Sequence, residues 1–172
     1  TVPPLANIKF ALKDRVFNSD QNGVAQIELF DSGNYQLKLL LEPESIHTPD
    51  TKLTFARWND AVFTPERTVE FTHRDLSYQI GFELSHPVET TFIDLGDETV
   101  DWSRVESLTL KSSAAAYRTI TQEEQPYWLQ ANRIMRQKIG IFPTPLLWSV
   151  ESVMLDGSNV VNRYQQRFYV EP

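Results

Sequence analysis

The sequence predicts a mainly β protein, an antiparallel β-sandwich that is jelly-roll-like, with one inserted amphipathic α-helix near residues 122–139. Three observations lead to this prediction. Apolar and polar residues alternate with a period of two in several short segments, as half-buried strands require. Turn sequences rich in Gly, Asn, Asp and Ser separate these segments. One later segment places its apolar residues at steps of three and four, which is typical of a helix.

Residues 35–41 and 78–84 show the strand period most clearly, because every second side chain in each segment is apolar. The two apolar faces consist of Tyr35, Leu37, Leu39, Leu41, Tyr78, Ile80, Phe82 and Leu84. Further strands are predicted at residues 8–12, 25–30, 53–58, 68–72, 91–95, 107–111, 146–155 and 160–170. Short strands at this spacing favour an antiparallel sandwich or barrel over alternating βαβ units.

The helical pattern covers residues 121–140. Thr121 and Glu124 have the spacing of a capping box, and Pro126 marks an alternative, slightly later start. Gly140 is expected to end the helix, and the prolines that follow prevent its continuation. Its apolar stripe would consist of Trp128, Ala131, Met135 and Ile139. A basic set near the end, where cations favour the helix dipole, consists of Arg133, Arg136 and Lys138.

Length and composition limit the class of protein. With 172 residues, of which 41% are hydrophobic, the chain has the size of one domain, so we predict a single β-sandwich domain over residues 1–172. A net charge of −7 argues against a nucleic-acid partner. The chain has no cysteine, which excludes disulfides, thiolate nucleophiles and zinc–thiolate sites.

Membrane attachment is expected only through segments outside this chain. No apolar run approaches the roughly 20 residues that a spanning helix needs. Both ends resemble the ends of an excised domain or of a mature chain after signal removal, which favours a periplasmic or extracellular location.

No catalytic residue, metal site or cofactor is predicted. The sequence has no G-x-S-x-G elbow, P-loop or G-x-G-x-x-G motif. His47, His73 and His86 show no metal-binding spacing, and we interpret them as surface or strand-end residues. The acidic residues are too numerous for any one pair to indicate glycoside hydrolysis.

The segment FIDLGDETVDWSRVESLTLKS, residues 92–112, contains Asp94, Asp97 and Asp101 within eight positions. These carboxylates could bind calcium, which prefers oxygen ligands. The spacing does not match an EF-hand loop, and aspartate commonly bonds its own backbone in turns. We therefore predict that the three aspartates serve a turn, and that Trp102, which continues the alternation from Val100, packs in the core.

Trp58 is the best candidate for ligand contact. Leu53 and Phe55 share one face of their strand, and Trp58 has the opposite parity, so a straight strand would expose its ring. An exposed tryptophan beside polar groups can stack on a sugar ring. The predicted ligand-binding residues are Arg57, Trp58, Asn59 and Asp60. The alternatives are a bulge or strand end that turns Trp58 inward, or a protein interface.

The run TVDWSRVESLTLK, preceded by YQIGFEL and TTFIDL, resembles jelly-roll carbohydrate-binding modules over roughly residues 53–111. The resemblance implies a noncatalytic, ligand-binding β-sandwich, of the kind found in secreted polysaccharide enzymes and in extracytoplasmic domains of bacterial membrane sensors. The predicted helix departs from that pattern.

We therefore expect a noncatalytic extracytoplasmic ligand-binding or sensory domain of a larger bacterial membrane-linked protein, acting in signal transduction. Its ligand would be a small molecule or a glycan. The alternative is a structural or protein-interaction module of an envelope or secreted assembly, and a third hypothesis is a glycan-active enzyme. The sequence determines neither the ligand nor the oligomeric state.

Overall fold

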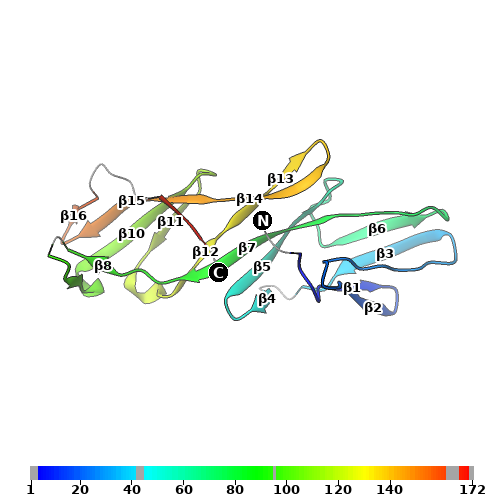
Figure 1. Cartoon of the computed structure of the whole chain (residues 1–172), viewed down its shortest axis with the longest axis horizontal. Helices are drawn as coiled ribbons and strands as arrows, with labels where there is room; N and C mark the ends of the chain where they lie inside the picture. Colours follow the sequence, from blue (N-terminus) through cyan, green and yellow to red (C-terminus); the bar gives the residue numbers. More distant parts are fainter. Residues whose placement is uncertain (1–3, 42–44, 95, 162–166, 171–172) are drawn as a thin grey trace. The chain divides into compact units, whose positions relative to one another are not determined.

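The computed structural model describes residues 4–41, 45–94, 96–161 and 167–170 (Figure 1). These residues form β-strands and two single-turn 3-10 helices, η1 (Trp102–Arg104) and η2 (Gln122–Glu124). The strand pairs whose registers are defined are all antiparallel. The prediction of a mainly β, antiparallel protein is therefore confirmed.

The chain forms two compact units. Unit 1 consists of Thr1–Ser45, Leu53–Glu83 and Ile134–Pro143. Unit 2 consists of Ile46–Lys52, Leu84–Arg133 and Thr144–Pro172. The sequence predicts a single domain over residues 1–172, and the division into two compact units leaves this as a prediction.

Unit 1 contains a four-stranded sheet in the order β2-β1-β3-β6. Its strands are β1 (Lys9–Leu12), β2 (Arg15–Asn18), β3 (Gly33–Leu39) and β6 (Glu66–Phe71). Strand β3 alternates between buried and exposed side chains, so that one face carries an apolar row, as its sequence predicts. The core of unit 1 consists of Leu12, Tyr35, Leu37, Trp58 and Val69.

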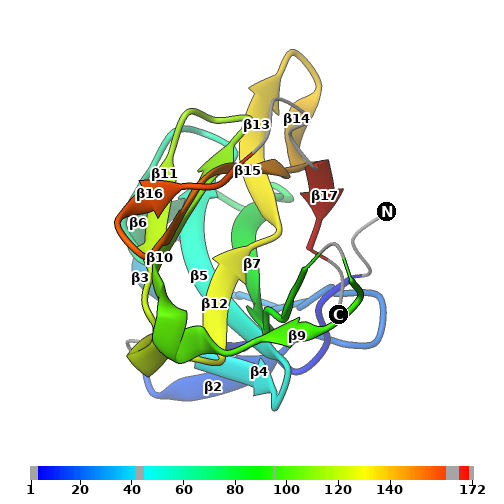
Figure 2. The ribbon, with the colours of Figure 1, turned by 90° about the vertical axis from the view of Figure 1, so that its left-hand side faces the viewer.

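Unit 2 contains a five-stranded sheet in the order β11-β10-β15-β16, with β17 also paired to β15 (Figure 2). Its strands are β10 (Val105–Ser112), β11 (Tyr117–Ile120), β15 (Leu147–Leu155), β16 (Ser158–Asn159) and β17 (Arg167–Tyr169). A register irregularity between Val105 and Ser107 moves the buried side chains of β10 from odd to even positions. The fully buried core of unit 2 includes Leu108, Leu110, Ile120, Tyr127 and Leu129.

A third sheet has the order β12-β7-β5-β4, and two hairpins, β8-β9 and β13-β14, complete the strands of the described residues. The sheet consists of β4 (Ser45–Thr48), β5 (Thr51–Trp58), β7 (Ile80–Val88) and β12 (Tyr127–Gln130). The hairpins consist of β8 (Phe92–Ile93), β9 (Thr99–Val100), β13 (Asn132–Gln137) and β14 (Gly140–Pro145).

The prediction of an amphipathic helix near residues 122–139 is wrong. Only the single turn η2 forms, with the Glu124 side chain accepting a hydrogen bond from the Thr121 backbone N–H at 3.3 Å, as in the predicted cap. The chain then enters β12, where Tyr127 and Leu129 are buried while Trp128 is only half-buried, a period of two. Pairing of β12 with β7 satisfies the backbone groups that a helix would have bonded internally.

Among the other predicted strands, most are confirmed within a few residues, but the segment 25–30 has no regular structure. Of the predicted strand 160–170, only Arg167–Tyr169 is a strand, and residues 162–166 lie outside the described part. The sequence did not predict eight of the strands, because short segments without strict alternation give little signal. These are β2, β4, β9, β11, β12, β13, β14 and β16.

Candidate functional site

The prediction that Trp58 is exposed is wrong, because its side chain is only 1% exposed. The indole Nε1–H donates to the carbonyl oxygen of Thr64 at 2.9 Å. The Trp58 backbone N–H donates to Val62 O at 2.8 Å, and Ala61 has a φ of 70°, so the chain turns sharply where β5 ends. The alternative of a strand end that turns the ring inward is confirmed.

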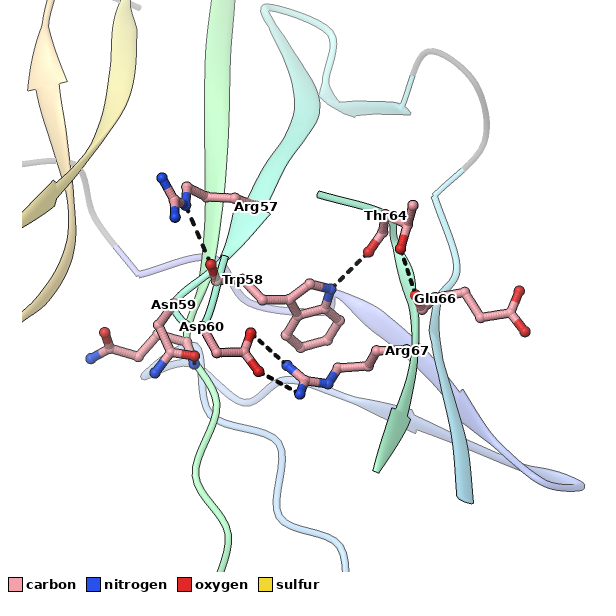
Figure 3. A network of polar contacts seen from close by, with 8 residues as sticks. Arg57, Trp58, Asn59, Asp60, Thr64, Glu66 and Arg67 are labelled. Carbon is pink, nitrogen blue, oxygen red and sulfur yellow. Dashed lines mark hydrogen bonds and ion pairs between the residues drawn. The ribbon is translucent and has the colours of Figure 1, made fainter. Parts of the chain in front are cut away.

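Arg67 on β6 closes the other side of this cluster (Figure 3). Its guanidinium donates to both carboxylate oxygens of Asp60, at 2.9 and 2.6 Å, in the bidentate geometry that suits an arginine. The guanidinium carbon lies 3.8 Å from the ring centroid of Tyr78 and 5.1 Å from that of Trp58. The hydrogen bond from Arg67 is the main cause that lowers the pKa of Asp60.

The remaining predicted residues also make internal contacts. Asn59 Oδ1 accepts from the Gln79 backbone N–H at 3.3 Å, and Arg57 Nε donates to Trp58 O at 3.4 Å. The Arg57 guanidinium lies over the ring of Phe63, 4.8 Å from its centroid. The four predicted residues, Arg57 to Asp60, do lie together. Their contacts stabilise the end of β5, and the indole ring of Trp58 is covered on both faces. Ligand binding by this cluster stays a prediction.

The acidic turn has the structural role that the sequence predicts for Asp94 and Asp101. Asp94 Oδ1 accepts from the backbone N–H groups of Gly96 and Glu98, at 2.7 and 3.0 Å. Asp101 Oδ1 accepts from Ser103 N at 2.7 Å and caps η1, and this backbone hydrogen bond lowers the pKa of Asp101. Asp97 supplies a left-handed residue with a φ of 60°, a conformation that aspartate tolerates. Within the described residues no group of three His, Asp or Glu could hold a metal ion.

The histidines behave differently from one another. His86 lies within β7 and is buried, with Nδ1 2.8 Å from Asp50 O and 3.3 Å from Thr51 Oγ1, so its interpretation as a surface or strand-end residue is wrong. His73 is exposed, as expected. The side chain of His47 lies outside the described part.

A hollow of about 330 Å³ lies in unit 2 beside the acidic turn. Its lining includes Thr90, Phe92, Thr99, Asp101, Trp102 and Gln125. Trp102 packs against the core of unit 2, as predicted, and also forms part of this lining. The rings of Phe92 and Trp102 meet edge to face, with centroids 4.7 Å apart.

Thr90 joins the walls of this hollow. Its carbonyl oxygen accepts from Trp102 Nε1–H at 2.8 Å, and its hydroxyl lies 2.6 Å from the hydroxyl of Tyr127. Its backbone N–H donates to Gln125 Oε1 at 3.3 Å. The bonds to Tyr127 and Gln125 join residues 37 and 35 positions apart in the sequence, which no local sequence pattern indicates.

Gln125, which belongs to the lining of the hollow, has a side-chain donor without a partner. Its Nε2 group is shielded and has no hydrogen-bond partner among the residues that the structure describes. The terminal torsion of a glutamine side chain is broad. Turning this donor towards a ligand requires rotation of the amide, which also displaces Oε1 from the Thr90 N–H 3.3 Å away. Asp101 contributes acceptor capacity, since an ionised carboxylate can accept several hydrogen bonds and one is made to Ser103.

Comparison of the chain with protein-family models, with curated proteins and with solved structures found no match. In the described part of the chain, no helix has the length and hydropathy needed to cross a bilayer.

Proposed function

We propose that the chain is a noncatalytic ligand-binding or sensory domain of a larger bacterial membrane-linked protein, periplasmic or extracellular, and that the hollow beside Trp102 binds a small, neutral, hydroxyl-bearing ligand such as a sugar. The observation that carries the proposal is the composition of the hollow. Gln125, whose shielded Nε2 has no partner among the described residues, belongs to a lining that also holds aromatic rings, threonines and carboxylates.

The charge of the lining disfavours an anionic ligand. Glu89 and Asp101 repel an anion, and the lining holds no cationic side chain that could offset this repulsion. A hydroxyl group both donates and accepts, so it suits the carboxylate of Asp101 and the amide of Gln125 together. The volume of about 330 Å³ falls at the small end of ligand pockets and suits a single sugar unit.

A binding role agrees better with the chemistry of the hollow than a catalytic one. A general acid at neutral pH needs a raised pKa, whereas the backbone hydrogen bond from Ser103 lowers the pKa of Asp101. The glycan-active enzyme is therefore the less favoured hypothesis.

The sandwich arrangement belongs to the same proposal. We expect the apolar face of each sheet to pack against a second β layer, in a jelly-roll-like manner. Support comes from the buried row on β3 and from the buried positions of β10, since a sheet with one apolar face must cover it.

The alternative function is a protein-interaction module of an envelope or secreted assembly. Unit 1 exposes large aromatic side chains at Phe30 and Phe63, which are 76% and 64% exposed. Such residues favour contact with another protein. In the complete gene, a membrane segment followed by a signalling domain would favour sensing, and neighbouring assembly genes would favour this alternative.

Saturation-transfer NMR with a panel of neutral sugars, a sugar acid and an amino sugar tests the ligand proposal. We expect signals from one or more neutral sugars and weaker signals from the sugar acid, which the carboxylates of Glu89 and Asp101 repel. Gln125→Glu keeps an oxygen for the Thr90 N–H but removes the amide donor, so the affinity should fall about tenfold. Gln36→Glu on β3 of unit 1 is the matched control and should bind normally. Absence of any signal, or equal loss in both variants, would reject the proposal.

A further inference from the structure

A second surface has a charge that the proposed function does not use. From Gln125 to Val150 the sequence has no acidic residue and three cations, Arg133, Arg136 and Lys138. The whole chain has 16 cations and 23 acidic residues, so 13 cations and 23 acidic residues remain elsewhere, a net charge of −10. The cations thus lie in a locally basic segment of an otherwise strongly acidic chain.

The hairpin tip, which we define as residues 135–139 at the end of β13 and in the turn before β14, is exposed at every position. Ile139 is 83% exposed and Met135 43% exposed. Ile139 has the largest exposed fraction among the exposed large apolar side chains of the described residues. The tip extends away from the strands β5 and β6 of unit 1 in Figure 1. It therefore presents two apolar side chains together with the cations Arg136 and Lys138.

The base of the hairpin is closely seated within unit 1. A Cβ atom at Gly81 on β7 would lie 2.6 Å from Ile134 Cγ2, so glycine is required for this approach. A Cβ at Gly140 would lie 2.7 Å from Gln79 Oε1, and Gly140 has a φ of 148°, which side chains rarely adopt. The tip is consequently supported at a defined position.

On the sequence alone, these cations are attributed to the favourable dipole at a helix end. The segment is a hairpin, so no helix dipole explains their position. Arg136 and Lys138 have no ion pair with any residue that the structure describes. We infer that the hairpin tip binds the surface of an anionic lipid bilayer, with Ile139 and Met135 entering the interface and Arg136 and Lys138 contacting lipid phosphates.

A lipid surface suits the tip better than an acidic protein. A stable protein interface buries about 800 Å² on each partner, which is more than five residues at a hairpin tip provide. A bilayer needs no such area, since apolar side chains enter it and long cationic side chains reach the headgroups. The inference does not depend on the ligand proposal. Membrane attachment is expected from the sequence only through segments outside this chain, and the hairpin tip would add a membrane contact within the chain.

Sedimentation with vesicles tests the inference directly. At low ionic strength, where charges are weakly screened, the chain should sediment with vesicles of 30% phosphatidylglycerol in phosphatidylcholine and not with pure phosphatidylcholine. Each cation near an anionic surface contributes about a fivefold change in partitioning, so Arg136→Gln with Lys138→Gln should weaken binding roughly twenty-five-fold. The matched control is Lys9→Gln with Arg15→Gln, which removes two exposed cations from β1 and β2 elsewhere in unit 1. The control variant should bind as the unaltered chain does.

The absence of cysteine permits a second, independent measurement. An environment-sensitive fluorophore on Ile139→Cys should shift to shorter wavelength with anionic vesicles, and the same label on Val16→Cys should not. No binding to anionic vesicles, equal binding to neutral ones, or no shift at position 139 would overturn the inference. Binding of polyglutamate without any vesicle response would instead indicate an acidic protein partner.

Discussion

Trp102 donates its indole N–H to the carbonyl oxygen of Thr90 across 2.8 Å, and this bond closes the segment that contains the acidic turn. The segment includes the hairpin β8-β9, in which Phe92 pairs with Val100. The same threonine carries bonds to Tyr127 and Gln125, so the wall of the hollow and the entry to β12 share one residue. A change at Trp102, Tyr127 or Gln125 should therefore disturb both the wall of the hollow and the entry to β12.

Tyr127→Phe should lower the free energy of unfolding at neutral pH by about 1 kcal/mol, because the Thr90 hydroxyl loses its partner. Burial raises the pKa of Tyr127 above its ordinary value of 10.0. The folded state therefore retains the proton longer than the unfolded state, and the stability from this group is fully present below pH 10 and lost as pH rises through the folded pKa. Urea unfolding between pH 7 and 11 should show a smaller alkaline loss in Tyr127→Phe. Tyr169→Phe, at an exposed position, should retain the full alkaline loss.

Asp60→Asn should destabilise the protein at pH 7 and have no effect in strong acid. Arg67, whose side chain is 8% exposed, loses its bidentate partner, but Asp60 is 41% exposed, so solvent screening limits the cost to about 1 kcal/mol. The pKa of Asp60 is lowered below 3.8, so this stability is present above that pH and is lost as pH falls through the folded pKa. Denaturant titrations at pH 7 and pH 2 measure the difference. Asp156→Asn breaks the exposed pair with Arg104 and should change little at either pH; an equal effect of the two variants would contradict the prediction.

Trp58→Phe should lower the free energy of unfolding by about 1–3 kcal/mol, since the smaller ring leaves a gap and no longer donates to Thr64. Phe63→Leu, at an exposed position on the same turn, should stay within about 0.5 kcal/mol of the unaltered chain. Thermal and urea unfolding provide the measurement. If Trp58→Phe instead left stability unchanged and abolished ligand binding, Trp58 would be a ligand-binding residue and its stabilising role would be rejected.

Gly81→Ala should cost about 1–3 kcal/mol of stability, because its Cβ atom would lie 2.6 Å from Ile134 Cγ2. Ile134→Ala removes the obstructing atoms, so the double variant should be more stable than the sum of the single changes predicts, with a coupling of at least about 0.5 kcal/mol. Gly157→Ala is a control for backbone strain alone, since no atom lies within 4 Å of its Cβ position while its φ is 77°. Additive single changes at positions 81 and 134 would show that the two residues are not in contact.

Much of the strand content could be predicted because it depends on local alternation. Tyr35, Leu37 and Leu39 are buried on β3, as their spacing requires. The acidic turn was also predictable, since Asp94 and Asp101 bond backbone groups only two to four residues away.

The helix could not be excluded from the sequence. Trp128, Ala131 and Met135 fit a helical stripe, and the competing strand depends on the pairing of Tyr127 with Val88, which lies far away in the sequence. Local propensity is a weak prior that such pairing overrides.

The sequence by itself determined the antiparallel β character, the acidic charge and the aspartate turn, because each depends on composition or on near neighbours. The tertiary structure alone decided that Trp58 is buried against Arg67, that Thr90 and Gln125 meet beside Trp102, and that the basic segment ends in an exposed hairpin tip. The physical reason is the same in each case. Hydrogen bonds and ring contacts between residues distant in the chain set which side chains are covered, and the sequence carries no local signal for such partners.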